Sequence, residues 1–395
     1  MSSDDPVIYL DHAATTPVDP DVFRAMAPYF TAGFGNPSSI YQVGQAARSA
    51  LDDARAKISR VLGCHPSEIV FTSGATESNN LALKGVAWAA RLRSPDGPPP
   101  HIVTTAIEHH AVLHAAEALE RQGFTVSYVG SDAQGVVDPG EVAGAIRPET
   151  CLIAVMYANN EVGSIQPVAE ICRAGRANGI PVHTDAVQAA GALTLNVDGI
   201  GVDLLALSAH KFYGPKGVGL LYVRKGTPIW FQQHGGGQES GRRGGTENVP
   251  LIVGMAEALI RADANREHAN ALARAMRDQL WARIVGEISQ VTLNGPDLDG
   301  PRLPNNLNVS LPGLQGETAL LSLDMAGVAA SAGSACTTGN SEPSHVLCAM
   351  GVSEDACRAS LRFTVGRLNT AEQIDDAADA LVETVNRMAL LSGAR

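Results

Sequence analysis

Residues 181–223, PVHTDAVQAAGALTLNVDGIGVDLLALSAHKFYGPKGVGLLYV, contain three short apolar runs separated by polar, glycine-containing stretches. The runs at 181–184, 203–207 and 217–223 have strand length, and their apolar character is typical of strands buried on both faces. The same rhythm extends through residues 68–225, where further apolar runs alternate with helical patterns. This alternation predicts an α/β layered fold with a mostly parallel central sheet. Ligands of such sheets bind at the carboxyl ends of the strands.

Within residues 68–225, the pattern predicts strands at 68–72, 101–105, 124–129, 151–157, 181–184, 203–207 and 217–223. It predicts helices at 76–92, 109–122, 138–146 and 167–178. A long helical pattern from about 251 to 284 changes the rhythm. Strands near 290–294 and 305–311 and helices near 316–325 and 370–391 follow it. We therefore predict a large domain, residues 16–255, and a smaller α+β domain made of residues 1–15 and 256–395.

The composition is that of an ordinary folded protein, with 395 residues of which 45% are hydrophobic and 18% charged. The formal net charge of −12 disfavours binding to nucleic acid or an anionic membrane. Apolar stretches fall short of the roughly 20 residues that cross a bilayer, and the acidic N-terminus lacks an apolar signal core. We therefore expect a cytoplasmic enzyme without nucleic-acid or membrane partners. The six cysteines form no C-x-x-C pair, so no metal site is expected.

Two charged residues follow neighbouring apolar runs. Lys211 comes just after the run at 203–207, where partial desolvation makes an amine a usable nucleophile. Asp185 ends the preceding run, and a carboxylate buried there requires a cation. Considered alone, Lys211 is equally well explained as a lysine at the end of a strand that extends into solvent. Considered alone, Asp185 is better explained as a helix N-cap than as a ligand of a cation. Together they match the needs of pyridoxal 5'-phosphate, which takes a lysine for its Schiff base and an Asp for its pyridine nitrogen.

A candidate phosphate site lies in the segment 71–79, FTSGATESN, which joins a predicted strand to a predicted helix. Small and hydroxyl residues at a helix start leave backbone N–H groups for an anion, although a simple N-cap has the same pattern. The side chains of Ser208 and His210, beside Lys211, are candidate donors to the same phosphate.

Three further polar residues, His109, Asn160 and Arg362, are candidate site residues. His109 begins a helix after a strand, where a histidine can stack on an aromatic cofactor or act as an acid or base, or simply be solvated. Asn160 belongs to the segment YANNEVG at 157–163, after the most apolar run, where an Asn orients a ligand oxygen or makes a turn. Arg362 lies in an apolar strand pattern, which suits either a bound carboxylate or a structural ion pair.

Two glycine-rich loops stand apart from the predicted elements. Residues 234–248, HGGGQESGRRGGTEN, have the length and polarity of a binding loop, with a solvated basic turn as the alternative. Residues 328–343, VAASAGSACTTGNSEP, carry Cys336 among side chains too small and polar to bury it. An accessible thiol of this kind is a candidate reactive group, whereas the other cysteines are interpreted as core residues.

In this order, the motifs resemble those of the NifS/IscS family of cysteine desulfurases, which are class-V aminotransferases of PLP fold type I. The resemblance covers nearly the whole chain. The matching motifs are YLDHAATTP (9–17), FGNPSS (34–39), TSGATES (72–78), EHHAV (108–112), NNEVG (159–163), SAHK (208–211), GGGQE (235–239), SAGSACTT (331–338) and EPSHV (342–346). The long loop around Cys336 is similar to the NifS and IscS group rather than the SufS-like group, and the segment at 242–248 leans toward the NifS branch.

The resemblance implies roles for twelve residues. It implies Lys211, Cys336 and His109 as catalytic residues. It implies cofactor contacts from Ala75, Thr76, His109, Asn160, Asp185, Gln188, Ser208, His210, Lys211 and Thr246. Asn160 and Arg362 are implied to bind the substrate, with Arg362 holding its carboxylate.

In that family, the lysine corresponding to Lys211 forms the Schiff base and moves protons, while Asp185 pairs with the pyridine nitrogen and His109 stacks over the ring. Thr246 is implied to reach the phosphate of the other subunit of a homodimer. Cys336 is implied to accept sulfur from L-cysteine as a persulfide, with L-alanine as the other product.

The implied function is therefore a sulfurtransferase, a cysteine desulfurase, that passes sulfur to an acceptor or iron–sulfur scaffold protein. The sequence leaves the identity of that acceptor and the pathway open. Selenocysteine lyase shares most of the implied site, and a non-catalytic sulfur-transfer scaffold is the alternative outside enzymes. The pair of Lys211 and Asp185 argues against the scaffold.

Overall fold

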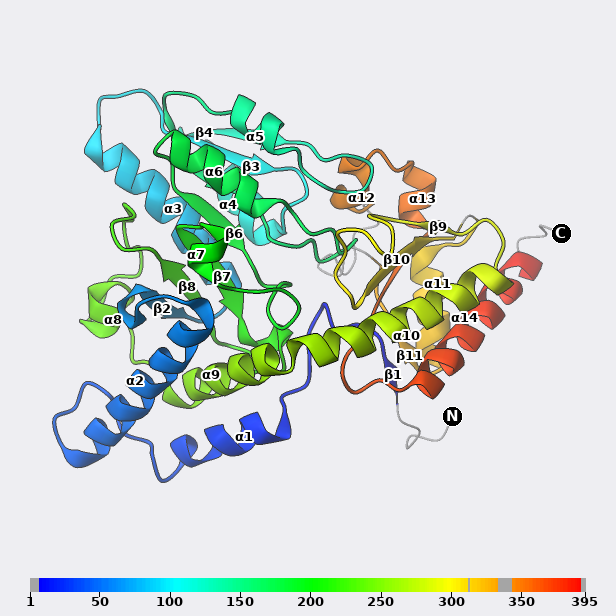
Figure 1. Cartoon of the computed structure of the whole chain (residues 1–395), viewed down its shortest axis with the longest axis horizontal. Coiled ribbons are helices and arrows are strands. Elements are labelled where there is room, and N and C mark those ends of the chain that lie inside the picture. Colours follow the sequence, from blue (N-terminus) through cyan, green and yellow to red (C-terminus); the bar gives the residue numbers. More distant parts are fainter. Residues whose placement is uncertain (1–6, 312, 333–342, 392–395) are drawn as a thin grey trace.

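The computed structural model describes residues 7–311, 313–332 and 343–391. Figure 1 shows a larger part built around an extended sheet and a smaller part that carries the last helix of the chain. The cavity described below lies where these two parts meet, lined by residues of both.

The larger part contains a seven-stranded sheet. In spatial order its strands are β2 (Ile69–Thr72), β8 (Gly219–Val223), β7 (Leu204–Ser208), β6 (Val182–Asp185), β5 (Thr150–Ala154), β3 (His101–Thr105) and β4 (Thr125–Val129). β8 runs antiparallel to both its neighbours, and the other strand pairs are parallel. The connection 209–218 is too short for the crossover that a parallel strand needs, so β8 must turn back. The predicted α/β fold with a mostly parallel sheet is confirmed.

Alternate residues of each strand enter different hydrophobic clusters, because side chains of a strand point to opposite faces. On β7, Leu204 belongs to the cluster that contains α3 (Ala75–Arg93) and α4 (His110–Glu120). Leu205 belongs to the cluster formed with α2 (Gln42–Leu62), α6 (Val168–Ala177) and α9 (Val249–Ala264). The sheet is therefore covered on both faces, as its unbroken apolar runs predict.

The remaining helices of the larger part are short. They are α1 (Pro20–Met26), η1 (Ala27–Phe30), η2 (Pro66–Glu68), α5 (Pro139–Gly144), α7 (Val197–Ile200), η3 (Ala209–Lys211) and α8 (Gln238–Gly241). The long helix α2 is not among the elements predicted from the sequence. Its buried residues are spaced three or four apart through most of its length, which is the pattern of a helix packed on one side.

The smaller part has its own core. β10 (Asn306–Ser310) lies between β12 (Ser360–Thr364) and β9 (Thr292–Leu293), and both pairings are antiparallel. β1 (Ile8–Tyr9) pairs with β11 (Val328–Ala329), so the start of the chain joins this part. The surrounding helices are α10 (Arg266–Glu287), α11 (Gly316–Met325) and α14 (Ala371–Leu391). Two further helices, α12 (His345–Ala349) and α13 (Glu354–Arg358), pack instead against the core of the larger part.

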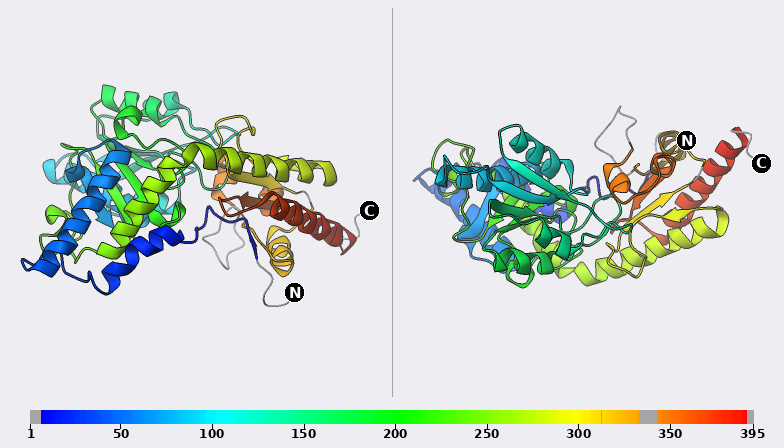
Figure 2. Two further views of the ribbon diagram at one scale, coloured as in Figure 1. Left: turned by 60° about the horizontal axis from the view of Figure 1, so that its bottom comes forward. Right: turned by 90° about the horizontal axis from the view of Figure 1, so that it is seen from above.

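The two parts are joined by α9 and α10, which follow one another along the molecule in Figure 1 and in the left view of Figure 2. The single helix predicted at 251–284 is in fact these two helices, separated at Asn265. The predicted domain boundary at 255 and 256 falls within α9, and the domain division stays a prediction. In the described ranges, no helix is long and apolar enough to cross a membrane.

One glycine on β8 connects the sheet to the candidate phosphate site. A Cβ at Gly219 would lie 2.7 Å from Cα of Gly74 and 2.6 Å from the carbonyl oxygen of Leu207. Both neighbours are backbone atoms, which cannot rotate away. The absence of a side chain at Gly219 therefore lets the turn before α3 approach β8.

We predict that Gly219→Ala lowers the free energy of unfolding by about 1–3 kcal/mol, because the added methyl forces backbone shifts in a packed core. Thermal unfolding of the purified variant measures the change. Gly130→Ala is the matched control, since a Cβ at Gly130 would meet no atom within 4 Å. Equal melting temperatures for the two variants would contradict the prediction.

Candidate active site

Ten of the twelve side chains predicted from the sequence line one cavity of about 590 Å³. They are Ala75, Thr76, His109, Asn160, Asp185, Gln188, Ser208, His210, Lys211 and Arg362. Thr246 is exposed and does not line this cavity. Cys336 lies outside the described residues. The individual roles of these residues stay predictions, but the structure brings most of them to one place.

Asp185 ends β6 and is 6% exposed. Its Oδ2 accepts a hydrogen bond from Nδ2 of Asn79 at 2.6 Å, and its Oδ1 accepts one from the backbone N–H of Val187 at 3.0 Å. The amide oxygen of Asn79 lies 2.8 Å from Nε2 of His183. Burial lowers the pKa of His183 to about 3, so this ring is neutral at ordinary pH. Asn79 and His183 thus orient the carboxylate without supplying a positive charge.

No role is predicted for Asn79 from the sequence, although it is the last residue of the candidate phosphate segment 71–79. A signal was available: Asn79 lies on the first turns of α3, the helix that also carries the candidate phosphate site. Only the fold shows that this position points at Asp185, 106 residues away along the chain.

Lys211 lies at the end of η3, immediately after β7. Its Nζ donates hydrogen bonds to the carbonyl oxygens of Ala13 at 2.6 Å and Ala14 at 2.8 Å. Nε2 of Gln188 donates to the same oxygen of Ala13 at 3.0 Å. The N-terminal segment therefore forms one wall of the cavity beside the lysine, a role that its sequence did not reveal.

The N-terminus of α3 forms another side of the cavity. Gly74 precedes the helix and no side chain of the described residues caps its first turn, so the N–H groups of Ala75 and Thr76 suit an anion. His210 lies close by, with Nδ1 3.1 Å from Oγ1 of Thr15. Burial lowers the pKa of His210 to about 4, helped by the charges of Lys211 and Lys216. A neutral His210 can still donate one hydrogen bond to a phosphate.

His109 is the N-cap of α4, where its Nδ1 accepts a hydrogen bond from the N–H of Ala111 at 3.1 Å. Burial lowers the pKa of His109, and the charge of Asp185 acts in the opposite direction. The ring is thus fixed by a backbone bond and lines the cavity near that carboxylate, as a stacking role requires.

Glu108, the residue before His109, is buried, with 1% of its surface exposed. Its Oε1 accepts hydrogen bonds from the hydroxyl of Thr105 at 2.8 Å and from the N–H of Met156 at 2.7 Å. Its Oε2 is buried and has no hydrogen-bond partner among the described residues. Burial raises the pKa of Glu108 to about 8, so this side chain is mainly a neutral acid at pH 7.

Arg362 lies on β12 and is 1% exposed. Its Nη1 donates to the carbonyl oxygen of Asn160 at 3.0 Å and its Nη2 to Oδ1 of Asp11 at 2.7 Å. Its Nε is buried with no hydrogen-bond partner in the part of the chain that the structure describes. Asp11 is a second residue that sequence reasoning missed, and it holds the guanidinium in place at the edge of the cavity.

The sequence and the fold of the chain are similar to those of known proteins. The model of the class-V aminotransferase family matches residues 8–376. The cysteine desulfurase IscS of Dictyoglomus turgidum is 46% identical over 385 residues, which cover 98% of this chain and 96% of the relative. A solved NifS-like protein has a TM-score of 0.89 and 38% identity, covering 96% of this chain and all of that one. A structure described as SspA in complex with cysteine has a TM-score of 0.79 and 38% identity, and the match covers 92% of this chain and 99% of that one.

The chain belongs to the cysteine desulfurase family of class-V aminotransferases. It is accordingly an enzyme of the cysteine desulfurase type with the predicted fold type I architecture. Enzymes of this family use pyridoxal 5'-phosphate.

The site of this desulfurase-family enzyme fits that cofactor on several independent observations. The buried Asp185 receives hydrogen bonds only from neutral groups among the described residues, so a protonated ring nitrogen would supply the missing positive charge. The uncapped start of α3 suits the phosphate, and the Lys211 amine lines the same cavity. Its volume of about 590 Å³ is typical of pockets for small molecules. No group of three or more His, Cys, Asp or Glu residues in the described ranges is placed to hold a metal ion.

The raised pKa of Glu108 predicts a pH-dependent contribution to stability. The folded protein keeps a proton on Glu108 up to about pH 8, whereas the unfolded chain loses it near the ordinary value of 4.5. Stability from this group is therefore fully present below pH 4.5 and falls as pH rises, by about 1.4 kcal/mol per pH unit within the window.

We predict that Glu108→Gln removes this slope, since Gln keeps the neutral shape and both accepted hydrogen bonds. Melting temperatures of the variant and the original protein, measured from pH 5 to about pH 8, provide the check. The variant should gain relative stability as pH rises. Parallel curves for the two proteins would show that Glu108 is ionised in the folded state.

Proposed function

We propose that this protein binds pyridoxal 5'-phosphate at Lys211 and transfers sulfur from L-cysteine to the thiol of Cys336, releasing L-alanine. The observation that supports it most is the convergence of Lys211, Asp185 and Arg362 on one cavity with an uncapped helix N-terminus. The overall step balances as L-cysteine plus a protein thiol giving L-alanine plus a protein persulfide.

The cofactor, when bound, supplies an electron sink that stabilises negative charge on the substrate carbon skeleton. The protein side chains do the rest. Asp185 holds a proton at the ring nitrogen, and Asn79 fixes the direction of its carboxylate. The ring of His109, tied to the backbone of α4, covers one face of the cavity. Lys211, with its Nζ on two carbonyl oxygens, receives and returns protons at the reacting carbon.

Substrate selection falls to Arg362. Its buried guanidinium has Nε available to donate to a carboxylate. Hydrogen bonds between an arginine guanidinium and a carboxylate are among the stronger ones in proteins. Asn160 is held beside it through its own backbone carbonyl. The cysteine complex of the similar solved structure agrees with an amino-acid substrate of this size.

The predicted sulfur acceptor, Cys336, lies in the segment 333–342, and the described residues on both sides of it adjoin the cavity. Ser331 and Arg362 exchange backbone hydrogen bonds of 3.1 and 2.6 Å. His345, after the segment, lines the cavity and contacts the carbonyl oxygen of Glu108 at 2.9 Å. The described residues that flank this segment thus lie at the site, which supports Cys336 as the residue that takes up sulfur.

We also propose a homodimer in which Thr246 serves the partner's cofactor. Thr246 is exposed, and its loop is tied to the first turn of α3 by the ion pair of Arg243 with Glu77 at 2.9 Å. Large apolar side chains are exposed on the segment from α1 to α2 of the single chain, as expected for a surface that a second subunit covers. They are Phe23, Phe30, Phe34, Ile40 and Tyr41. The proposed destination of the sulfur is a cytoplasmic acceptor or iron–sulfur scaffold protein.

The test records the visible spectrum of the purified protein, then adds L-cysteine and measures sulfide under reductant together with alanine. We expect a yellow protein whose spectrum changes and which produces both. We expect Cys336→Ala to stay yellow and yield no sulfide, because it lacks the acceptor thiol. A colourless protein after addition of the cofactor would refute the assignment of Lys211. Sulfide from Cys336→Ala at the original rate would refute the acceptor, and a strong preference for selenocysteine would favour the lyase.

A second prediction concerns Arg362→Lys. Lysine keeps the charge but loses the planar pair of donors, so KM for L-cysteine should rise about tenfold or more while the visible spectrum is retained. Steady-state sulfide production gives KM. Arg358→Lys, an exposed arginine paired with Glu354 on α13, is the control and should leave KM unchanged. An unchanged KM in Arg362→Lys would assign the substrate carboxylate to another group.

A further inference from the structure

The position of the Lys211 amine depends on two backbone segments. Its Nζ bonds to the carbonyl oxygens of Ala13 and Ala14, and its own backbone belongs to the turn that follows β7. Because the acceptors are main-chain atoms, their place relative to the lysine is set by whatever holds the two segments together. The distance between the segments along the chain is nearly 200 residues.

Thr16 and Tyr213 form the first link between these segments. The N–H and the hydroxyl of Thr16 both donate to the carbonyl oxygen of His210, at 2.9 and 3.0 Å. The hydroxyl oxygen of Thr16 accepts the N–H of Tyr213 at 2.7 Å. Tyr213 has a φ of +64°, a left-handed conformation that a bulky residue adopts only where its surroundings enforce it.

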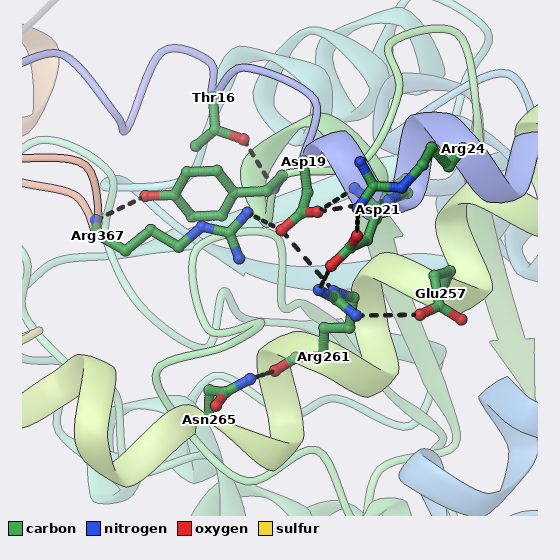
Figure 3. A network of polar contacts seen from close by, with 10 residues as sticks. Thr16, Asp19, Asp21, Arg24, Glu257, Arg261, Asn265 and Arg367 are labelled. Atoms are coloured by element: carbon green, nitrogen blue, oxygen red, sulfur yellow. Dashed lines mark hydrogen bonds and ion pairs between the residues drawn. The ribbon is translucent and has the colours of Figure 1, made fainter.

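Arg367, from the connection between β12 and α14, holds Tyr213 from the other side. Its guanidinium stacks over the Tyr213 ring, 3.9 Å from the centroid, and the backbone N–H of Arg367 donates to the Tyr213 hydroxyl at 2.9 Å. The same guanidinium forms an ion pair with Asp19, whose N–H bonds to the carbonyl oxygen of Tyr213 at 3.0 Å. Figure 3 shows how Arg367, Asp19 and Thr16 converge, with Arg261 on the far side of Asp19.

We propose that Thr16, Asp19, Tyr213 and Arg367 form a clamp that positions Lys211 for proton transfer. This inference rests on the function proposed above. The four side chains act on the Lys211 amine through the backbone of 13–16 and 210–213. The four are therefore positioning residues. The clamp also ties the lysine to the strand that carries Arg362, since Arg367 follows β12 by a few residues.

A positioning role makes a different prediction from a purely structural one. Loss of the clamp should impair the step in which Lys211 moves a proton, which lowers kcat, while Arg362 still binds the substrate carboxylate and KM changes less. It should also alter the pH at which the visible band of the resting holoenzyme changes, because that band reports on the surroundings of Lys211. A merely structural role would lower thermal stability and leave both readouts unchanged.

The experiment compares Arg367→Ala and Tyr213→Phe with Arg283→Ala in the holoenzyme. Arg283 is the matched control, because its side chain is 31% exposed, as that of Arg367 is, and pairs with acids on α10 and α14 away from the cavity. Tyr213→Phe removes only the hydroxyl that accepts the Arg367 N–H, so the turn keeps its packing. Each protein is measured for kcat, KM, the pH midpoint of the visible band and melting temperature.

We expect Arg367→Ala to lower kcat about 10- to 100-fold, the loss caused by a small misplacement of a reacting group, and to shift the pH midpoint. Tyr213→Phe should lower kcat and shift the pH midpoint in the same direction but by a smaller amount. Arg283→Ala should leave kcat and the pH midpoint unchanged. The clamp is refuted if both variants keep the kcat and pH midpoint of the control, or if their kcat falls only with the fraction of folded protein. If the original protein itself lacks the band or releases no sulfide, the proposed function fails, independently of the clamp.

Discussion

A carboxylate buried at the end of β6 sets the main constraint on this structure. Asp185 is almost fully removed from water, and the described groups that donate hydrogen bonds to it are the neutral side chain of Asn79 and a backbone N–H. Burying an anion in this way is unfavourable unless a positive charge completes the site. The fold provides a cavity directly beside it, which Lys211 and the start of α3 also line, and there they would complement the other ends of the proposed cofactor.

The N-terminal segment has a larger part in the site than its length suggests. Residues 11–19 contact Arg362 through Asp11, Lys211 through two carbonyl groups, and Arg367 through Asp19. These contacts connect the start of the chain, the centre of the sheet and the last strand of the smaller part. A movement of any of these three segments would therefore displace the Lys211 amine, so the contacts keep that amine and the Arg362 guanidinium in a fixed relative position.

Charge and burial divide the histidines and acids of the site into distinct classes. His183 and His210 have their pKa values lowered by burial to about 3 and 4, and are neutral donors or acceptors at neutral pH. Glu108 has its pKa raised to about 8 and acts as a neutral acid. These buried groups are thus uncharged near neutral pH, whereas the charges that line the cavity come from Asp185, Lys211 and Arg362 together with Glu77, Glu161 and Lys216.

The sequence by itself determined where the strands and most helices lie, because burial on two faces leaves an apolar run that can be read locally. It also indicated Lys211, Asp185 and the turn at 71–79, since each follows directly on such a run. Only the tertiary structure decided that Asn79 orients Asp185, that Asp11 holds Arg362, and that Tyr213 is clamped by Arg367. Each of these contacts joins residues more than 100 positions apart, with no periodicity to signal it. Their physical origin is the packing of three separate chain segments around one cavity, which no local pattern encodes.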